Sequence, residues 1–245
     1  MPDFPTMKLP LVITGTIMPQ SNFVHITDWR LRREQYLDAL RFFCESNAVF
    51  FLENSAYEIQ GDSGFDLKNL TVVKLRDSEN CYELGKGHQE FKMLDRFLST
   101  DQAPRRFLKI SGRRKLRQID YFQARYSQSR RQYFDLWQND GFADTSFFCC
   151  DLSFYNANLR GIYPQANDST GAIIEKLAYQ ALANAPEVRF HPITPLYTGQ
   201  HGTSGNKLKS KYHIPTELSR FFRRLQGKTK MDKRIFDWGK LRVEG

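Results

Sequence analysis

Short apolar segments alternate with longer segments of helical spacing in the first 116 residues. Four segments have the length and the apolar, β-branched composition of buried strands, at residues 9–17, 48–55, 70–77 and 106–113. Apolar side chains at intervals of three and four residues predict helices over 28–46, with Asp28 as its N-cap, and over 87–99. The order strand, helix, strand, strand, helix, strand predicts an α/β fold with a mostly parallel sheet flanked by helices.

The second half of the chain has a less regular pattern. It predicts a helix over 120–137, a strand within 144–155, a helix that begins at Ser169 or Thr170, and a last helix from Pro215 to Gly227. We expect one domain over residues 1–206 and a basic, amphipathic segment over 207–245.

Small and polar residues follow three of the predicted strands. The three sets are Thr14-Gly15-Thr16, Glu53-Asn54-Ser55 and Ser111-Gly112-Arg113. The carboxyl ends of parallel strands meet at one edge of a sheet, and α/β proteins bind their ligands at this edge. We therefore expect these three sets to form one site.

The positive charge of the chain is concentrated at its C-terminal end. The net charge is +9, and residues 207–245 contribute +8 of it, with twelve Lys and Arg against four Asp and Glu. This asymmetry predicts contact with an anionic surface, either lipid or nucleic acid. The last predicted helix favours an anionic membrane, because arginines alternate with Leu218, Phe221, Phe222 and Leu225. Packing of this helix against the body is the competing interpretation.

Several classes of function lack their motifs in this chain. There is no Walker loop, no G-x-G-x-x-G after the first strand and no G-x-S-x-G, and the five histidines do not pair at metal-ligand spacing. The four cysteines form no C-x-x-C pair, which indicates a reduced, cytoplasmic protein. The first 15 residues also lack the pattern of a secretory signal.

Five pieces of sequence occur in a characteristic order between residues 11 and 113. They are LVITGTI, QYLDAL, VFFLENSAY, ELGKGHQEFKMLD and FLKISGR. In this order they resemble a family of bacterial glycosyltransferases from lipopolysaccharide O-antigen and capsule gene clusters, with the motifs E-N-S, G-K-G-x-x-E and F-x-K-x-[ST]-G-R. His88-Gln89 departs from that pattern, since family members often carry aromatic residues or glycine there.

The resemblance implies a GT-A-like, Rossmann-type fold and a peripheral enzyme at the inner face of the membrane. Such an enzyme would transfer a sugar from a nucleotide-sugar donor, expected to be UDP-linked, to a lipid-linked or cell-surface glycan acceptor. The alternative is a nucleic-acid-binding module that uses the basic segment. We expect no specific nucleic-acid partner, because the aromatic residues lie in apolar, periodic runs typical of a core.

The diphosphate leaving group of such a donor needs its negative charge neutralised. Many GT-A enzymes hold a divalent metal with a D-x-D motif, whereas the comparable strand here ends in Ser111-Gly112-Arg113. We predict that Lys109 and Arg113 replace the metal, so that neither a metal nor another cofactor is essential. A salt bridge from Lys109 to Glu53 or Glu90 is the alternative.

Other candidate contacts with the donor lie in the second helix and in a later loop. Lys86 and Gly87 begin the helix, where free N–H groups suit an anion, and Glu90 would face the sugar. An ion pair between Lys86 and Glu90 is the alternative. A glycine-rich loop offers backbone N–H groups and hydroxyls for phosphate, or forms a generic turn, at Gly202, Thr203 and Ser204.

Two carboxylates raise separate questions. Glu53 ends a buried strand, where a carboxylate is costly unless it is paired or functional. It would either bind sugar or ribose hydroxyls, or pair with Lys109 or Arg113.

An inverting transfer also needs a base for the acceptor hydroxyl. Glu175 fits, because it lies between Ile174 and Leu177 and partial burial would raise its pKa. Asp151 and Asp168 are rival candidates for the base. The competing explanation for Glu175 is an ordinary surface carboxylate.

Overall fold

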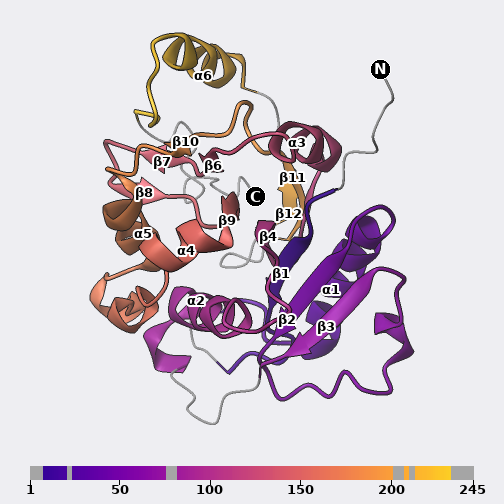
Figure 1. Cartoon of the computed structure of the whole chain (residues 1–245). Helices are drawn as coiled ribbons and strands as arrows, with labels where there is room; N and C mark the ends of the chain where they lie inside the picture. The colour runs from indigo at the N-terminus through magenta and orange to yellow at the C-terminus, as the bar shows by residue number, and fades with distance from the viewer. Residues whose placement is uncertain (1–7, 21–23, 76–81, 201–206, 210–212, 233–245) are drawn as a thin grey trace, which may run out of the picture.

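The core of the computed structural model is a seven-stranded sheet (Figure 1). The structure describes residues 8–20, 24–75, 82–200, 207–209 and 213–232. The strand order is β10-β6-β9-β4-β1-β2-β3, and every neighbouring pair is parallel except the two pairs that β9 forms. The strands are β1 (Leu11–Gly15), β2 (Val49–Glu53), β3 (Leu70–Lys74), β4 (Arg106–Ser111), β6 (Gln132–Tyr133), β9 (Phe147–Asp151) and β10 (Val188–Arg189). The predicted α/β fold with a mostly parallel sheet is confirmed.

Helices cover both faces of this sheet. One face carries α1 (Trp29–Cys44) and α3 (Ile119–Tyr126), and the other carries α2 (Lys86–Phe97), α4 (Leu152–Asn158) and α5 (Ile174–Leu182) (Figure 1). Side chains alternate across β1, so that Val12 packs in one core while Leu11 and Ile13 pack in the other. The predicted cap of α1 is confirmed, because the Asp28 carboxylate accepts a hydrogen bond from the backbone N–H of Arg30 at 2.9 Å.

Two predictions in the second half of the chain were wrong. The helix expected over 120–137 ends at Tyr126, and the chain then forms β6 and β7 (Leu136–Trp137). Pairing of β6 with β9 and β10 overrides the helical spacing of this segment. The helix expected from Ser169 or Thr170 begins later, because residues 168–170 form a 3₁₀ turn that a left-handed Gly171 ends.

The direction of β9 decides which of its ends reaches the expected site. Because β9 is antiparallel to β4, its last residue Asp151 lies beside Arg106, the first residue of β4. The residues that precede β9 lie at the other edge, where the Ser146 carbonyl accepts a hydrogen bond from the Ser111 N–H at 2.8 Å. The carboxyl edge of the parallel strands therefore receives the start of β9.

The remaining elements lie around the main sheet. A small antiparallel sheet contains β5 (Arg114–Leu116), β11 (Tyr197–Gln200) and β12 (Lys207–Lys209), and β7 pairs with β8 (Phe142–Ala143). Short 3₁₀ helices occur at Ser63–Phe65, Tyr82–Leu84, Tyr163–Gln165 and Asp168–Thr170. The helix α6 (Ile214–Leu225) lies at the periphery, and Met231 beyond it is buried against Trp137 (Figure 1). Among the described helices, none is long and apolar enough to cross a bilayer.

Candidate functional site

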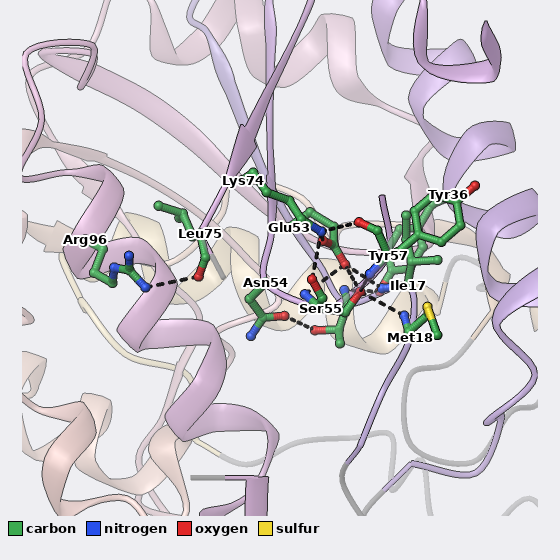
Figure 2. A network of polar contacts seen from close by, with 11 residues as sticks. Ile17, Met18, Tyr36, Glu53, Asn54, Ser55, Tyr57, Lys74, Leu75 and Arg96 are labelled. Carbon is green, nitrogen blue, oxygen red and sulfur yellow. Dashed lines mark hydrogen bonds and ion pairs between the residues drawn. The ribbon is translucent and has the colours of Figure 1, made fainter. Parts of the chain in front are cut away.

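The carboxylate of Glu53 organises the loop that follows β1. Figure 2 shows this fully buried side chain in an ion pair with Lys74 from the end of β3. Its Oε1 atom also accepts hydrogen bonds from the N–H groups of Ile17 and Ser55, both at 3.0 Å. The Ser55 hydroxyl accepts one from the Met18 N–H at 3.0 Å. Glu53 therefore pairs with Lys74, a partner the sequence did not suggest, and has a supporting role.

Asn54 supports the same loop from the other side. Its Oδ1 atom accepts a hydrogen bond from the Thr16 hydroxyl at 2.7 Å, and its amide lies 3.5 Å from Gln89 Oε1. The E-N-S motif thus fixes residues 16–18 through all three of its side chains.

A buried ion pair between Lys109 and Glu90 lies at the centre of the carboxyl edge. Lys109 is fully buried, and its ammonium group donates to Glu90, to the Ser111 hydroxyl and to the Thr145 carbonyl, each at 2.6 Å. Its three donors are therefore all used within the protein. The alternative of a salt bridge to Glu90 is what the structure shows, and Lys109 has no donor left for a diphosphate. Lys86 is not the partner of Glu90 in this pair.

The same pair gathers two of the predicted binding residues. Glu90 also accepts hydrogen bonds from the hydroxyls of Thr14 and Ser111. Burial by itself raises the pKa of Glu90, but the attraction of Lys109 and these hydrogen bonds outweigh it and hold the pKa below its usual value. Thr14 and Ser111 are consequently turned toward Glu90.

Arg113 is buried at the same edge without a carboxylate partner in the described ranges. It is 5% exposed, donates one hydrogen bond to the Gln35 side chain and lies over the Tyr36 ring at 5.9 Å. Burial lowers the pKa of Arg113, and the positive charges of Arg32 and Arg114 lower it further. Within the described residues this guanidinium has spare donors and no counter-charge, and a buried group of this kind can bind an anion.

A second buried guanidinium, that of Arg32, also lies beside Tyr36. The sequence analysis did not identify Arg32. It is 5% exposed and lies 5.7 Å from the Tyr36 ring. Its Nε and Nη2 atoms donate to the Thr16 carbonyl, Nη1 donates to the Ile26 carbonyl and Nη2 also donates to the Tyr36 hydroxyl, so one N–H of Nη1 remains for a ligand. No carboxylate pairs with Arg32 in the part of the chain that the structure describes. The sequence did contain a sign that Arg32 is buried. Arg32 precedes Tyr36, Leu40 and Phe43 on the apolar stripe of α1, where a charged residue is unexpected.

The glycines at this edge allow its parts to approach closely. A side chain at Gly15 would overlap the rings of Phe51 and Tyr36. Gly112 has a positive φ of 50° and donates its N–H to the Thr14 carbonyl at 2.9 Å.

Asp168 caps the helix that carries Lys86. Its carboxylate accepts a hydrogen bond from the Lys86 N–H at 3.1 Å, and a side chain at Gly85 would overlap it. This end of α2 therefore already has an anion, which removes one of its N–H groups from phosphate binding. Burial lowers the pKa of the Lys86 side chain, with Arg32 and Arg113 adding to the effect, while Asp168 and Glu175 oppose it.

A substitution can separate the capping role of Asp168 from a catalytic role. Asp168→Ala is expected to reduce the free energy of unfolding by about 1 kcal/mol, because an N–H group at the start of α2 loses its acceptor. Asp168→Asn keeps an oxygen acceptor and is expected to retain most of this stability. Urea unfolding of both variants measures the difference. Equal losses in the two variants would contradict the capping role.

Glu175 is the second residue of α5 and lies near Lys86 and Asp168. Its position depends on Gly87, where a side chain would overlap Ile174. Burial raises the pKa of Glu175, and the negative charges of Glu90, Asp168 and Asp144 raise it further. A hydrogen bond from its own backbone lowers it, and the resulting pKa is about 7. A carboxyl group with this pKa can exchange a proton near neutral pH.

Asp144 is a further carboxylate at this edge that the sequence analysis did not identify. It lies three residues before β9, is half-buried, and accepts hydrogen bonds from the N–H of Ser146 at 2.9 Å and from its hydroxyl at 2.6 Å. Its negative charge acts on both Glu175 and Lys109. Only the antiparallel direction of β9, which the sequence did not reveal, places Asp144 here.

The structure does not bring Asp151 to this site. Asp151 lies at the opposite edge of the sheet, paired with Arg106 at 2.8 Å and hydrogen-bonded by Gln132 at 2.7 Å. Because β9 runs antiparallel, its carboxyl end points away from the carboxyl ends of its neighbours. We therefore do not retain Asp151 as a candidate base.

The predicted loop residues are outside the described part, and the two cations that follow Arg113 have other partners. Gly202, Thr203 and Ser204 lie outside the described residues, between β11 and β12. Lys115 pairs with Asp38 at 2.6 Å, and Arg114 lies over the Tyr197 ring at 5.6 Å. The described residues contain no group of three or more His, Cys, Asp and Glu side chains that could hold a metal ion. The expectation about metal dependence stays a prediction.

Comparison with known proteins adds little to this geometry. No family profile and no curated protein matches the chain. Among solved structures, the chain is similar to HddC from Yersinia pseudotuberculosis, with 9% identity, 60% of this chain and 78% of that chain covered, and a TM-score of 0.36. A similarity at this level carries no argument about function.

Proposed function

We propose that the chain is a glycosyltransferase that moves a sugar from a nucleotide-sugar donor to a lipid-linked or cell-surface glycan acceptor. The observation that carries the proposal is the pair of buried guanidinium groups of Arg32 and Arg113, at the carboxyl edge of a mostly parallel sheet. The diphosphate of a nucleotide sugar supplies the negative charge that these groups lack. The ordered E-N-S, G-K-G-x-x-E and F-x-K-x-S-G-R motifs support the same reaction class.

Arg113 and Arg32 neutralise the leaving group in this proposal. Charge builds up on the diphosphate as its bond to the sugar breaks, and preorganised cations stabilise that charge most effectively in a site that excludes water. Lys109 positions Glu90 and Ser111 through its ion pair and hydrogen bond, and it does not contact the diphosphate. The proposed pair of cations therefore differs by one member from the pair expected from the sequence.

Glu175 acts as the base at the acceptor. The acceptor hydroxyl attacks the anomeric carbon, its proton passes to the Glu175 carboxylate, and the bond from the sugar to the diphosphate breaks. The product is an inverted glycoside and a nucleoside diphosphate. The elevated pKa of Glu175 suits this transfer, because it leaves the carboxylate basic enough to accept a proton.

Nucleotide binding by the arginines is tested by thermal shift. UDP, GDP, CMP and their sugars are added to the wild type, to Arg113→Ala and to Arg32→Ala, in EDTA and with manganese. We expect one nucleotide to raise the melting temperature of the wild type in EDTA, because binding to the folded state stabilises it. Each substitution is expected to weaken binding by about tenfold or more, the value of one charged hydrogen bond.

Arg41→Ala is the matched control. It removes an exposed arginine from the same helix as Arg32 and is expected to keep the full shift. A shift that requires manganese would retain the transferase and reject the two arginines as a substitute for the metal. No shift with any nucleotide would reject the proposed function.

A further inference from the structure

Helix α6 presents its apolar side chains to solvent and buries its polar side. Two of its polar side chains are almost fully buried, Thr216 at 3% and Arg220 at 1%. The exposed side chains are between 51% and 71% accessible, namely Ile214, Leu218, Phe221, Phe222 and Leu225. A terminal helix that packs on its domain normally shows the reverse arrangement. We call these five exposed side chains the outer face of α6.

A buried ion pair holds the helix in this orientation. The Arg220 guanidinium donates to both oxygens of Asp135, at 2.9 and 2.6 Å, and also to the His191 carbonyl at 2.9 Å and the Thr194 hydroxyl at 3.1 Å. Rotating the helix to bury its outer face would leave the Asp135 charge without its partner. The ion pair therefore fixes which face points outward.

The outer face forms one continuous stripe. Its positions follow the spacing i, i+4, i+7, i+8 and i+11 over the twelve residues of α6, a length of roughly 18 Å at the helical rise per residue. Contiguous exposed apolar surface of this kind marks an interaction site. Figure 1 shows α6 at the edge of the molecule, so that a large planar partner can reach it.

We propose that the outer face of α6 docks the protein on a lipid bilayer that contains anionic lipids. Arg224 and Lys228 are exposed beside this face, although Arg224 also donates to the Pro192 carbonyl at 3.3 Å. The basic segment from residue 207 onward complements an anionic surface. One face of a single twelve-residue helix is much smaller than the ~800 Å² per partner of a stable protein interface. Nucleic acid fits less well, because Ile214, Leu218 and Leu225 offer no aromatic ring for base stacking. Docking does not depend on the proposed transferase reaction.

Vesicle co-sedimentation of the full chain tests this docking. The vesicles contain phosphatidylcholine alone or phosphatidylcholine with about 30 mol% phosphatidylglycerol, an anionic lipid. We expect wild type to bind the anionic vesicles, binding to weaken as salt is raised, and Phe221→Ser/Phe222→Ser to bind about tenfold or more weakly. Arg224→Gln/Lys228→Gln is expected to reduce the preference for anionic vesicles, because it removes two of the twelve Lys and Arg side chains of the basic segment. Leu31→Ser, on another exposed leucine (48% accessible), is the control and should bind like wild type.

Melting temperatures of the variants show whether they remain folded, and the serine variant should melt no lower than wild type. Three results would overturn the proposal. The first is wild type that does not bind vesicles, and the second is a Phe221→Ser/Phe222→Ser variant that binds as well as wild type. The third is a stable dimer or an RNA complex of wild type that the serine substitutions abolish, because the outer face then has another partner.

Discussion

Glu175→Gln is expected to lower the turnover of sugar transfer by about 10²- to 10⁴-fold while leaving nucleotide binding intact. Glutamine keeps the size and hydrogen-bonding capacity of the side chain but cannot accept the proton of the acceptor hydroxyl. The measurement is release of nucleoside diphosphate from the donor that the thermal-shift panel identifies. Glu187→Gln, which changes an exposed carboxylate just beyond α5, is the control and should retain wild-type turnover.

The pH dependence of turnover gives an independent reading of the same residue. A base must be deprotonated to act, and the pKa of Glu175 is raised to about 7. Turnover should therefore increase as the pH rises through about 7 and level off above it. Loss of nucleotide binding together with turnover in Glu175→Gln would indicate a structural role, and unchanged turnover would exclude Glu175 as the base.

Lys109→Met is expected to reduce the free energy of unfolding by about 3–5 kcal/mol at pH 7, because it leaves the Glu90 carboxylate buried without its counter-charge. Denaturant unfolding measures this loss. Lys115→Met breaks a more exposed pair with Asp38 and should cost less than about 1 kcal/mol. Glu90→Leu/Lys109→Met removes both charges and is expected to recover much of the loss.

The effect of Lys109→Met should also depend on pH. In the wild type the pKa of Glu90 is lowered, so the pair stabilises the fold above the ordinary pKa of a glutamate and loses this contribution as the pH falls through the lowered value. In the variant, burial without Lys109 raises the pKa of Glu90, so its stability falls as the pH rises past about 4.3, the ordinary value. The gap between the two proteins should thus be wider at pH 7 than at pH 4. An equal gap at both pH values would contradict this account of the pair.

The sequence predicted the elements that follow from local spacing. The strands β1 to β4, the helices α1 and α2 and the Asp28 cap each carry a clear period or cap signal. The segment 120–137 has helical spacing too, but its second half pairs with strands from later in the chain. The orientation of α6 stayed open, because its apolar stripe fitted either a membrane surface or the body of the protein, and the Arg220–Asp135 pair turns it outward.

In the candidate site, too, the sequence predicted some features and missed others. The polar residues after β1, β2 and β4 do gather at one edge, as the parallel sheet requires. Their individual roles depended on partners from other elements, such as Lys74 for Glu53 and Glu90 for Lys109. Asp151 was expected at this edge and Asp144 was not identified, because the direction of β9 could not be predicted from the sequence. Pairing across the sheet is a three-dimensional property that sequence spacing alone does not encode.

The loop after β1 has a consequence for how this protein can change over evolution. The N–H groups of Thr16, Ile17 and Met18 are already bound by Tyr36, Glu53 and Ser55. They cannot form the backbone cradle with which glycine-rich loops hold phosphate. Under the proposed function, anion recognition at this edge therefore depends on side chains. A single substitution of Arg113, whose side chain donates to Gln35 and not to this loop, would alter anion binding while the loop keeps its conformation.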